Sequence, residues 1–136
     1  MRADLNAKLG WEKKTDKQCQ AEYEVQFQNI GKLPIKIEKS RISVWYLSEP
    51  TKAASPVEYI DPLSMKQQQL FSEDNDRLNN DYAPGTKDSE GFSFVVQKAN
   101  RRMLFEIDIF GKDSNGKPEH WHDFHWDNVC GDEGQK

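Results

Sequence analysis

Three histidines lie close together in one short segment near the end of this chain. They are His120, His122 and His125, and single tryptophan, aspartate and phenylalanine residues separate them. If the segment is a β-strand, the His-x-His spacing puts two imidazoles on one face, about 7 Å apart. Metal sites often use imidazoles at this separation, so a metal site through the three histidines is one hypothesis for the chemistry of the chain.

The hairpin expected before this segment tests that hypothesis. Asn115-Gly116 is typical of a two-residue hairpin loop, and such a loop would pair residues 105–109 with residues 122–126. In this register apolar residues mostly face apolar residues, for example Phe105 opposite Trp126. This match between the apolar positions of the two expected strands supports the register.

The predicted register divides the histidines between the two faces of the strand. It places His120 and His122 on the core face and His125 on the opposite face, beside Glu106. A β-bulge near Asp123 would shift the parity of the strand by one residue, and the metal-site hypothesis would then be open again. Without a bulge, two ligands are too few for a metal site, so histidines that pair locally at the rim of the core are the favoured interpretation.

Aromatic residues form a second candidate site. In the same register Phe110 faces Trp121 on the outer face of the sheet, and Trp45 lies on the outward parity of its own strand. Exposed rings of this kind could stack on a sugar or on a partner's side chain, although cross-strand packing is the simpler interpretation. The same pairing sets Asp108 opposite Asp123, and these carboxylates should repel unless a cation lies near.

Cys19 and Cys130 are the two cysteines of the chain, and both have the parity of core residues. They are either two buried thiols or one bridge between an early strand and the last one, which would require an oxidising compartment. Glycine-rich phosphate loops, a G-x-S-x-G nucleophile elbow and the spacing of a calcium loop are absent from the sequence. We therefore expect neither an enzyme nor a cofactor.

Strands are the elements that would position these residues. Gln18–Gln28 alternates without a break between core-type residues and Gln or Glu, which is typical of a strand with one buried face. The turns recur at intervals of roughly 8–12 residues, and no stretch keeps a helical period. The sequence predicts an all-β fold, an immunoglobulin-like antiparallel β-sandwich of about 7–9 strands, with a closed barrel as the alternative. Further strands are expected over 4–13, 33–37, 42–46, 57–60, 63–71, 92–96, 103–109 and 119–129.

Length and composition indicate a single domain over residues 1–136, with an exposed acidic loop at about 72–84 and a tail at 131–136. The formal charge is −4 and no lysine or arginine cluster is present, which argues against nucleic acid as a partner. No apolar run is long enough for membrane insertion. The first residues form no hydrophobic leader, which fits a cytoplasmic protein or a module cut from a secreted or cell-surface protein.

A longer pattern resembles bacterial immunoglobulin-like modules. Tyr23-x-Val25-x-Phe27 leads into Asn29-x-Gly31, and Ala83-Pro84-Gly85 precedes the apolar alternation over 92–96. This arrangement of turns and strands is similar to CARDB-like and fibronectin type III-like domains. The resemblance implies an accessory sandwich used for binding or spacing.

The expected function is therefore a non-catalytic binding or spacer module that interacts with a protein partner within a larger protein or assembly. Two other functions stay open. One is a module that binds a carbohydrate or small ligand through Phe110, Trp121 and Trp45. The other is a metal-binding protein that uses the three histidines.

Overall fold

The computed structural model describes residues 2–47, 63, 66–97 and 102–129. Within these ranges the chain forms eight strands and no α-helix, in agreement with the predicted all-β class and number of strands. No helix long and apolar enough to cross a membrane occurs among these residues. The strands are β1 (Ala3–Lys13), β2 (Gln18–Asn29), β3 (Ile35–Leu47), β4 (Lys66–Asn75), β5 (Asn80–Tyr82), β6 (Lys87–Gln97), β7 (Met103–Lys112) and β8 (Pro118–Asp127).

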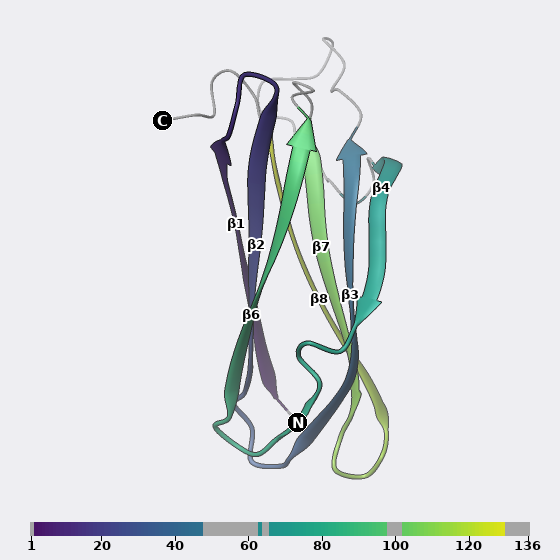
Figure 1. Cartoon of the computed structure of the whole chain (residues 1–136). Coiled ribbons are helices and arrows are strands. Elements are labelled where there is room, and N and C mark those ends of the chain that lie inside the picture. Colours follow the sequence, from purple (N-terminus) through teal and green to yellow (C-terminus); the bar gives the residue numbers. More distant parts are fainter. Residues whose placement is uncertain (1, 48–62, 64–65, 98–101, 130–136) are drawn as a thin grey trace, which may run out of the picture.

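The strands form two antiparallel sheets that pack face to face (Figure 1). One sheet has three strands in the order β1-β2-β6. The other has the order β4-β3-β7-β8, and the short β5 pairs with the first residues of β3. β7 is a central strand, paired with β3 on one side and with β8 on the other.

One parity of each strand fills the space between the sheets. In β2 the alternation predicted from the sequence is confirmed, because Cys19, Ala21, Tyr23, Val25 and Phe27 are all at most 3% exposed. Aromatic rings join the two layers, with Tyr23 near Phe105 and Phe27 near Tyr82 at centroid distances of 5.8 and 5.1 Å. The core also includes Ile35, Ile37, Ile42, Val44, Leu78, Phe92, Val96, Met103, Ile107 and Ile109.

Cys19 is disulfide-bonded rather than a free thiol. Of the two interpretations open from the sequence, the bridge is therefore correct for this residue. Cys130 lies outside the described residues, as do the candidate strand at 57–60 and the predicted tail at 131–136.

The predicted acidic loop over residues 72–84 is partly wrong. β4 continues to Asn75, and residues 80–82 form β5. Leu78 and Tyr82 are fully buried, and the Tyr82 hydroxyl donates to the Leu78 carbonyl at 2.9 Å. The polar composition of the segment concealed these two apolar anchors, which hold the connection against the core.

A side chain of β8 protects the free edge of the three-stranded sheet. The Ala7 amide of the edge strand β1 donates to Asp123 Oδ2 at 3.1 Å. A charged side chain at an unpaired edge discourages a second molecule from adding a strand there.

We expect Asp123→Ala to lower the free energy of unfolding by about 1 kcal/mol, because the Ala7 amide loses its partner. It should also increase self-association through the opened edge of β1. Urea unfolding and light scattering measure the two effects, and Asp127→Ala, at the exposed end of the same strand, is the control. Equal behaviour of the two variants would contradict this role of Asp123.

Candidate functional site

The loop between β7 and β8 is one residue longer than the sequence suggested. The Asp113 amide donates to the Lys117 carbonyl and the Gly116 amide to the Asp113 carbonyl, at 2.9 and 3.0 Å. Gly116 has a φ of 80°, in the left-handed region that glycine adopts most easily. Ser114, Asn115 and Gly116 therefore form a three-residue loop, and the predicted two-residue loop is wrong.

This extra residue shifts the register by one position and exchanges the faces of β8. Phe105 pairs with His125, Asp108 with His122 and Phe110 with His120. The predicted separation of His125 from the other two histidines is correct, but the assignment of their faces is reversed. His125 lies on the core side, with its ring 5.9 Å from that of Tyr23.

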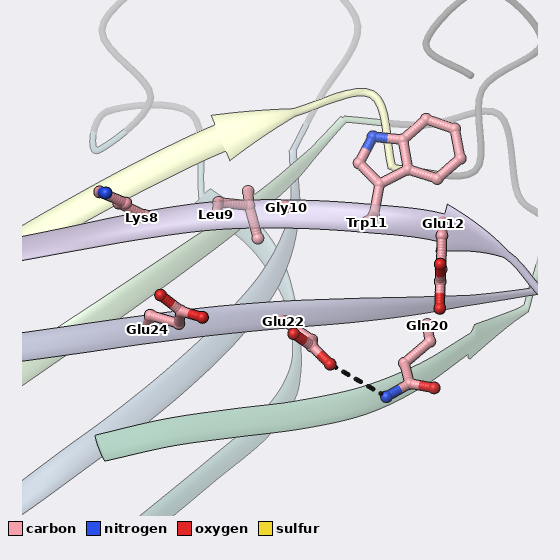
Figure 2. A pocket seen from close by; sticks show the side chains of 8 residues that line it. All are labelled: Lys8, Leu9, Gly10, Trp11, Glu12, Gln20, Glu22 and Glu24. Atoms are coloured by element: carbon pink, nitrogen blue, oxygen red, sulfur yellow. Dashed lines mark hydrogen bonds between the residues drawn. The ribbon is translucent and has the colours of Figure 1, made fainter. Parts of the chain in front are cut away.

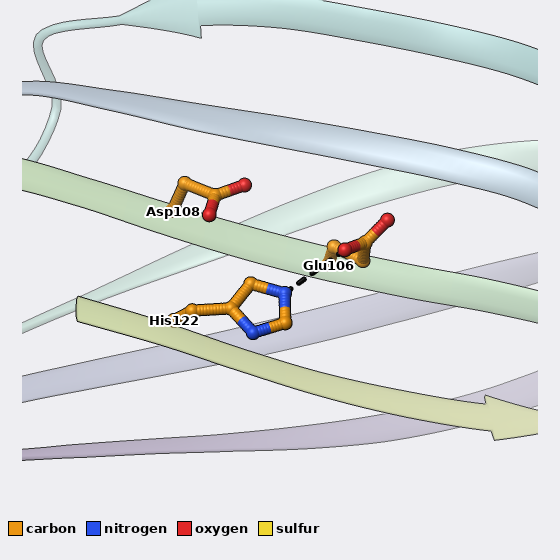
Figure 3. Close-up of side chains that lie close together, drawn as sticks. All are labelled: Glu106, Asp108 and His122. Carbon is orange, nitrogen blue, oxygen red and sulfur yellow. Dashed lines mark hydrogen bonds and ion pairs between the residues drawn. The ribbon is translucent and has the colours of Figure 1, made fainter. Parts of the chain in front are cut away.

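His120 and His122 lie on the outer face of the five-stranded sheet, where they meet two carboxylates of β7. Figure 3 shows His122 beside Glu106 and Asp108. His122 Nε2 lies 2.9 Å from Glu106 Oε2, and His120 Nε2 lies 2.8 Å from Asp108 Oδ1. One donor atom from each of Glu106, Asp108 and His122 falls within 4.8 Å of the other two. We call Glu106, Asp108, His120 and His122 the histidine–carboxylate cluster.

The four side chains differ in their exposure to solvent. The side chains of Glu106, Asp108, His122 and His120 are 6%, 19%, 29% and 50% exposed. The cluster thus has a nearly buried carboxylate at its floor and an open side formed by the imidazoles of the edge strand β8. Tyr23, on the core side, is affected by this negative charge. Its burial is the main cause that raises the pKa of its hydroxyl, and the carboxylates of Asp123, Glu106 and Asp108 raise it further.

Two cations of β3 border the cluster. Arg41 pairs with Asp108 in the register of β3 and β7, but its guanidinium binds Asp74 of β4, with Nε 2.7 Å from Oδ1. This hydrogen bond raises the pKa of Arg41 and lowers the pKa of Asp74. Lys39 reaches the same carboxylate at 3.7 Å. Asp74 therefore draws both cations toward β4.

The predicted aromatic platform is not assembled. Phe110 is on the outer face, but His120 stacks on its ring at 4.6 Å, and Lys39 lies 4.9 Å from the ring centroid. Trp121 pairs with Ile109 and packs on Phe27 at 5.1 Å, so the predicted pair of Phe110 and Trp121 is wrong. Trp45 pairs with Leu104, six residues along β7 from Phe110, which is roughly 20 Å of extended chain.

The carboxylate partners were missed because they depend on the register. The predicted pairing set Asp108 opposite Asp123, whereas Asp123 in fact pairs with Ile107. The available signal was the outward parity of Glu106 and Asp108 in an otherwise apolar strand.

A hollow lies on the outer face of the three-stranded sheet (Figure 2). It encloses about 420 Å³ between β1 and β2, and Gly10 leaves it open because no side chain occupies that position. Glu12, Glu22 and Glu24 line it, and all three are exposed. Exposed carboxylates are common on protein surfaces and do not by themselves define a binding site.

Comparison with known proteins supports the fold alone. No family model matches the chain, and no curated protein matches it. A crystal structure from Bordetella pertussis, provisionally named ApaA, aligns with a TM-score of 0.58 and 11% identity over 93% of this chain and 94% of its own. An X-ray structure of a Northeast Structural Genomics Consortium target aligns with a TM-score of 0.55 and 10% identity, over 99% and 91% of the two chains.

Proposed function

We propose that this chain is a non-catalytic, immunoglobulin-like binding module of the CARDB-like or fibronectin type III-like kind, which serves within a larger protein or assembly. The strand order supports this proposal. β1, β2 and β6 face a sheet in which β3, β7 and β8 are neighbours, as strands C, F and G are in immunoglobulin sandwiches, and β4 takes the position of strand C′.

One residue type that could act as a nucleophile is unavailable for catalysis at Cys19. The disulfide of Cys19 prevents a thiolate attack by this residue.

The observation that carries the proposal is the organisation of one outer face. On the five-stranded sheet, Glu106 binds His122, Asp108 binds His120, and His120 stacks on Phe110. On the outer face of the other sheet, the one side-chain pair among the described residues joins Gln20 and Glu22 at 3.3 Å. Side chains held in place before a ligand arrives bind it at a lower entropic cost. We therefore propose the histidine–carboxylate cluster as the binding site of the module.

A ligand panel observed by nuclear magnetic resonance tests this proposal. The isotope-labelled chain is titrated with acidic and basic peptides, short glycans and divalent metal ions, and amide shifts are followed. We expect saturable shifts over residues 104–110 and 119–124, with little change over residues 8–12 and 20–24, which serve as the control face.

Two results would contradict the proposal. One is a set of shifts confined to the hollow between β1 and β2. The other is the absence of saturable shifts with every class in the panel.

A further inference from the structure

The donor atoms of the histidine–carboxylate cluster match those that zinc-class ions prefer. Imidazole nitrogen and carboxylate oxygen bind Zn²⁺ at about 2.0–2.2 Å, so tetrahedral ligands lie roughly 3.3 Å from one another. The distance of 2.9 Å between Glu106 Oε2 and His122 Nε2 is slightly shorter than this. The ligand atoms of Glu106, Asp108 and His122 all lie within 4.8 Å of one another, a limit that is longer than the separation of roughly 3.3 Å. Small side-chain rotations therefore suffice to surround one ion.

The position of Glu106 makes the site more than a pair of surface imidazoles. Its side chain is 6% exposed, and it extends from β7, which is paired on both sides. A buried carboxylate on a central strand has little freedom, and burial of its charge is costly unless positive charge or hydrogen-bond donors lie near. A divalent ion would add positive charge at this buried carboxylate, beside the imidazole of His122.

His120 is placed to orient a ligand. Its Nε2 donates to Asp108 Oδ1 at 2.8 Å, while its ring lies flat on Phe110 at an interplanar angle of 3°. Such outer contacts hold a carboxylate in position and commonly change metal affinity by roughly 10–100-fold when removed. His120 is therefore a positioning residue for Asp108.

The cations beside the cluster do not block an ion. Arg41 and Lys39 both bind Asp74 on the far side of β3, at 2.7 and 3.7 Å. Asp74 thus offsets positive charge that would otherwise repel a metal ion bound at Asp108.

We propose that Glu106, Asp108 and His122 bind a divalent first-row transition-metal ion of the zinc class, with His120 holding Asp108 in place. This inference names the ligand of the site under the proposed function and rests on it. The ion lies between β7 and β8 and joins the edge strand to the centre of the sheet.

Isothermal titration of the metal-free chain with zinc chloride tests the inference. We expect one Zn²⁺ per chain, with an affinity that falls at least roughly 100-fold in Glu106→Gln and in His122→Gln, because each change removes a ligand. His120→Gln should weaken binding by roughly 10–100-fold while keeping the stoichiometry. His125→Gln is the matched control, since it makes the same change on the other face of the same strand. Thermal unfolding of each metal-free variant verifies its fold, and Asp108→Asn replaces any variant that does not fold.

Three outcomes would overturn the inference: no zinc binding, zinc binding that survives Glu106→Gln, or an equal loss in His125→Gln. Survival in Glu106→Gln would indicate an adventitious ion on His120 and His122. None of these outcomes would by itself overturn the proposed function. Peptide- or glycan-induced shifts over residues 104–110 would still support a binding module that does not use zinc.

Discussion

Gly111→Ala is expected to destabilise the domain by more than about 3 kcal/mol, or to prevent folding, because a side chain at this position has no room. A Cβ atom would lie well inside contact distance of the Lys36 carbonyl oxygen and 3.0 Å from Ile37 Cδ1. Gly111 pairs with Ile37, next to an irregularity of β3 that brings the backbone of β3 unusually close. A backbone carbonyl cannot move aside as a flexible side chain can, so the central pair of β3 and β7 would separate.

Urea unfolding followed by tryptophan fluorescence measures this effect, with far-ultraviolet circular dichroism to verify strand content. Gly10→Ala is the control, because a Cβ atom at that strand position meets nothing within 4 Å. We expect Gly10→Ala to be neutral or to stabilise by about 0.5 kcal/mol, since alanine loses less backbone entropy than glycine. A loss below about 1 kcal/mol in Gly111→Ala would show that β3 can move away, and would contradict the close approach described above.

Sequence alternation predicted the architecture because each sheet has one buried face. A strand between a core and solvent needs apolar residues at every second position, and β2 follows this rule from Cys19 to Phe27. The same rule failed over residues 76–82. There Leu78 and Tyr82 enter the core from a turn and from a strand of three residues, too short for a period to be visible.

The cluster could not be predicted because one turn decides which side chains meet. Asn115-Gly116 favours a two-residue loop, but Asp113 Oδ1 accepts the amides of Asn115 and Lys117, both at 2.9 Å. This interaction stabilises the longer loop. The difference of one residue exchanges the two faces of β8, so the chemistry of His120 and His122 depends on the side chain of Asp113.

Substitutions at Asn29 are expected to have the second large effect on stability, because this fully buried side chain joins three segments of the chain. Its Nδ2 donates to the carbonyls of Leu33 and Tyr82 at 2.8 and 2.9 Å, and its Oδ1 accepts the Gly31 amide at 2.9 Å. Its backbone carbonyl accepts the Gly85 amide at 2.8 Å. The side-chain amide of Asn29 therefore holds the turn after β2 and the end of β5, while its backbone carbonyl holds the turn before β6.

Asn29→Ala should lower the free energy of unfolding by about 3 kcal/mol, since three hydrogen bonds, one buried and two partly buried, lose a partner at about 1 kcal/mol each. Asn29→Asp should cost about 3–5 kcal/mol at neutral pH, because it sets a buried carboxylate against two carbonyl oxygens. This loss should shrink as the pH falls, because a protonated carboxyl group can again donate to one carbonyl.

Urea unfolding at pH 7 and pH 4 separates the two variants. Asn79→Ala is the control, since its amide makes one exposed hydrogen bond, to the Glu38 carbonyl at 2.6 Å, and its loss should cost less than about 1 kcal/mol. A penalty for Asn29→Asp that is the same at both pH values would mean that the cost comes from shape rather than from charge. The connection of the turn after β2 to the end of β5 would then depend on packing around Asn29, and its amide hydrogens would have no special role.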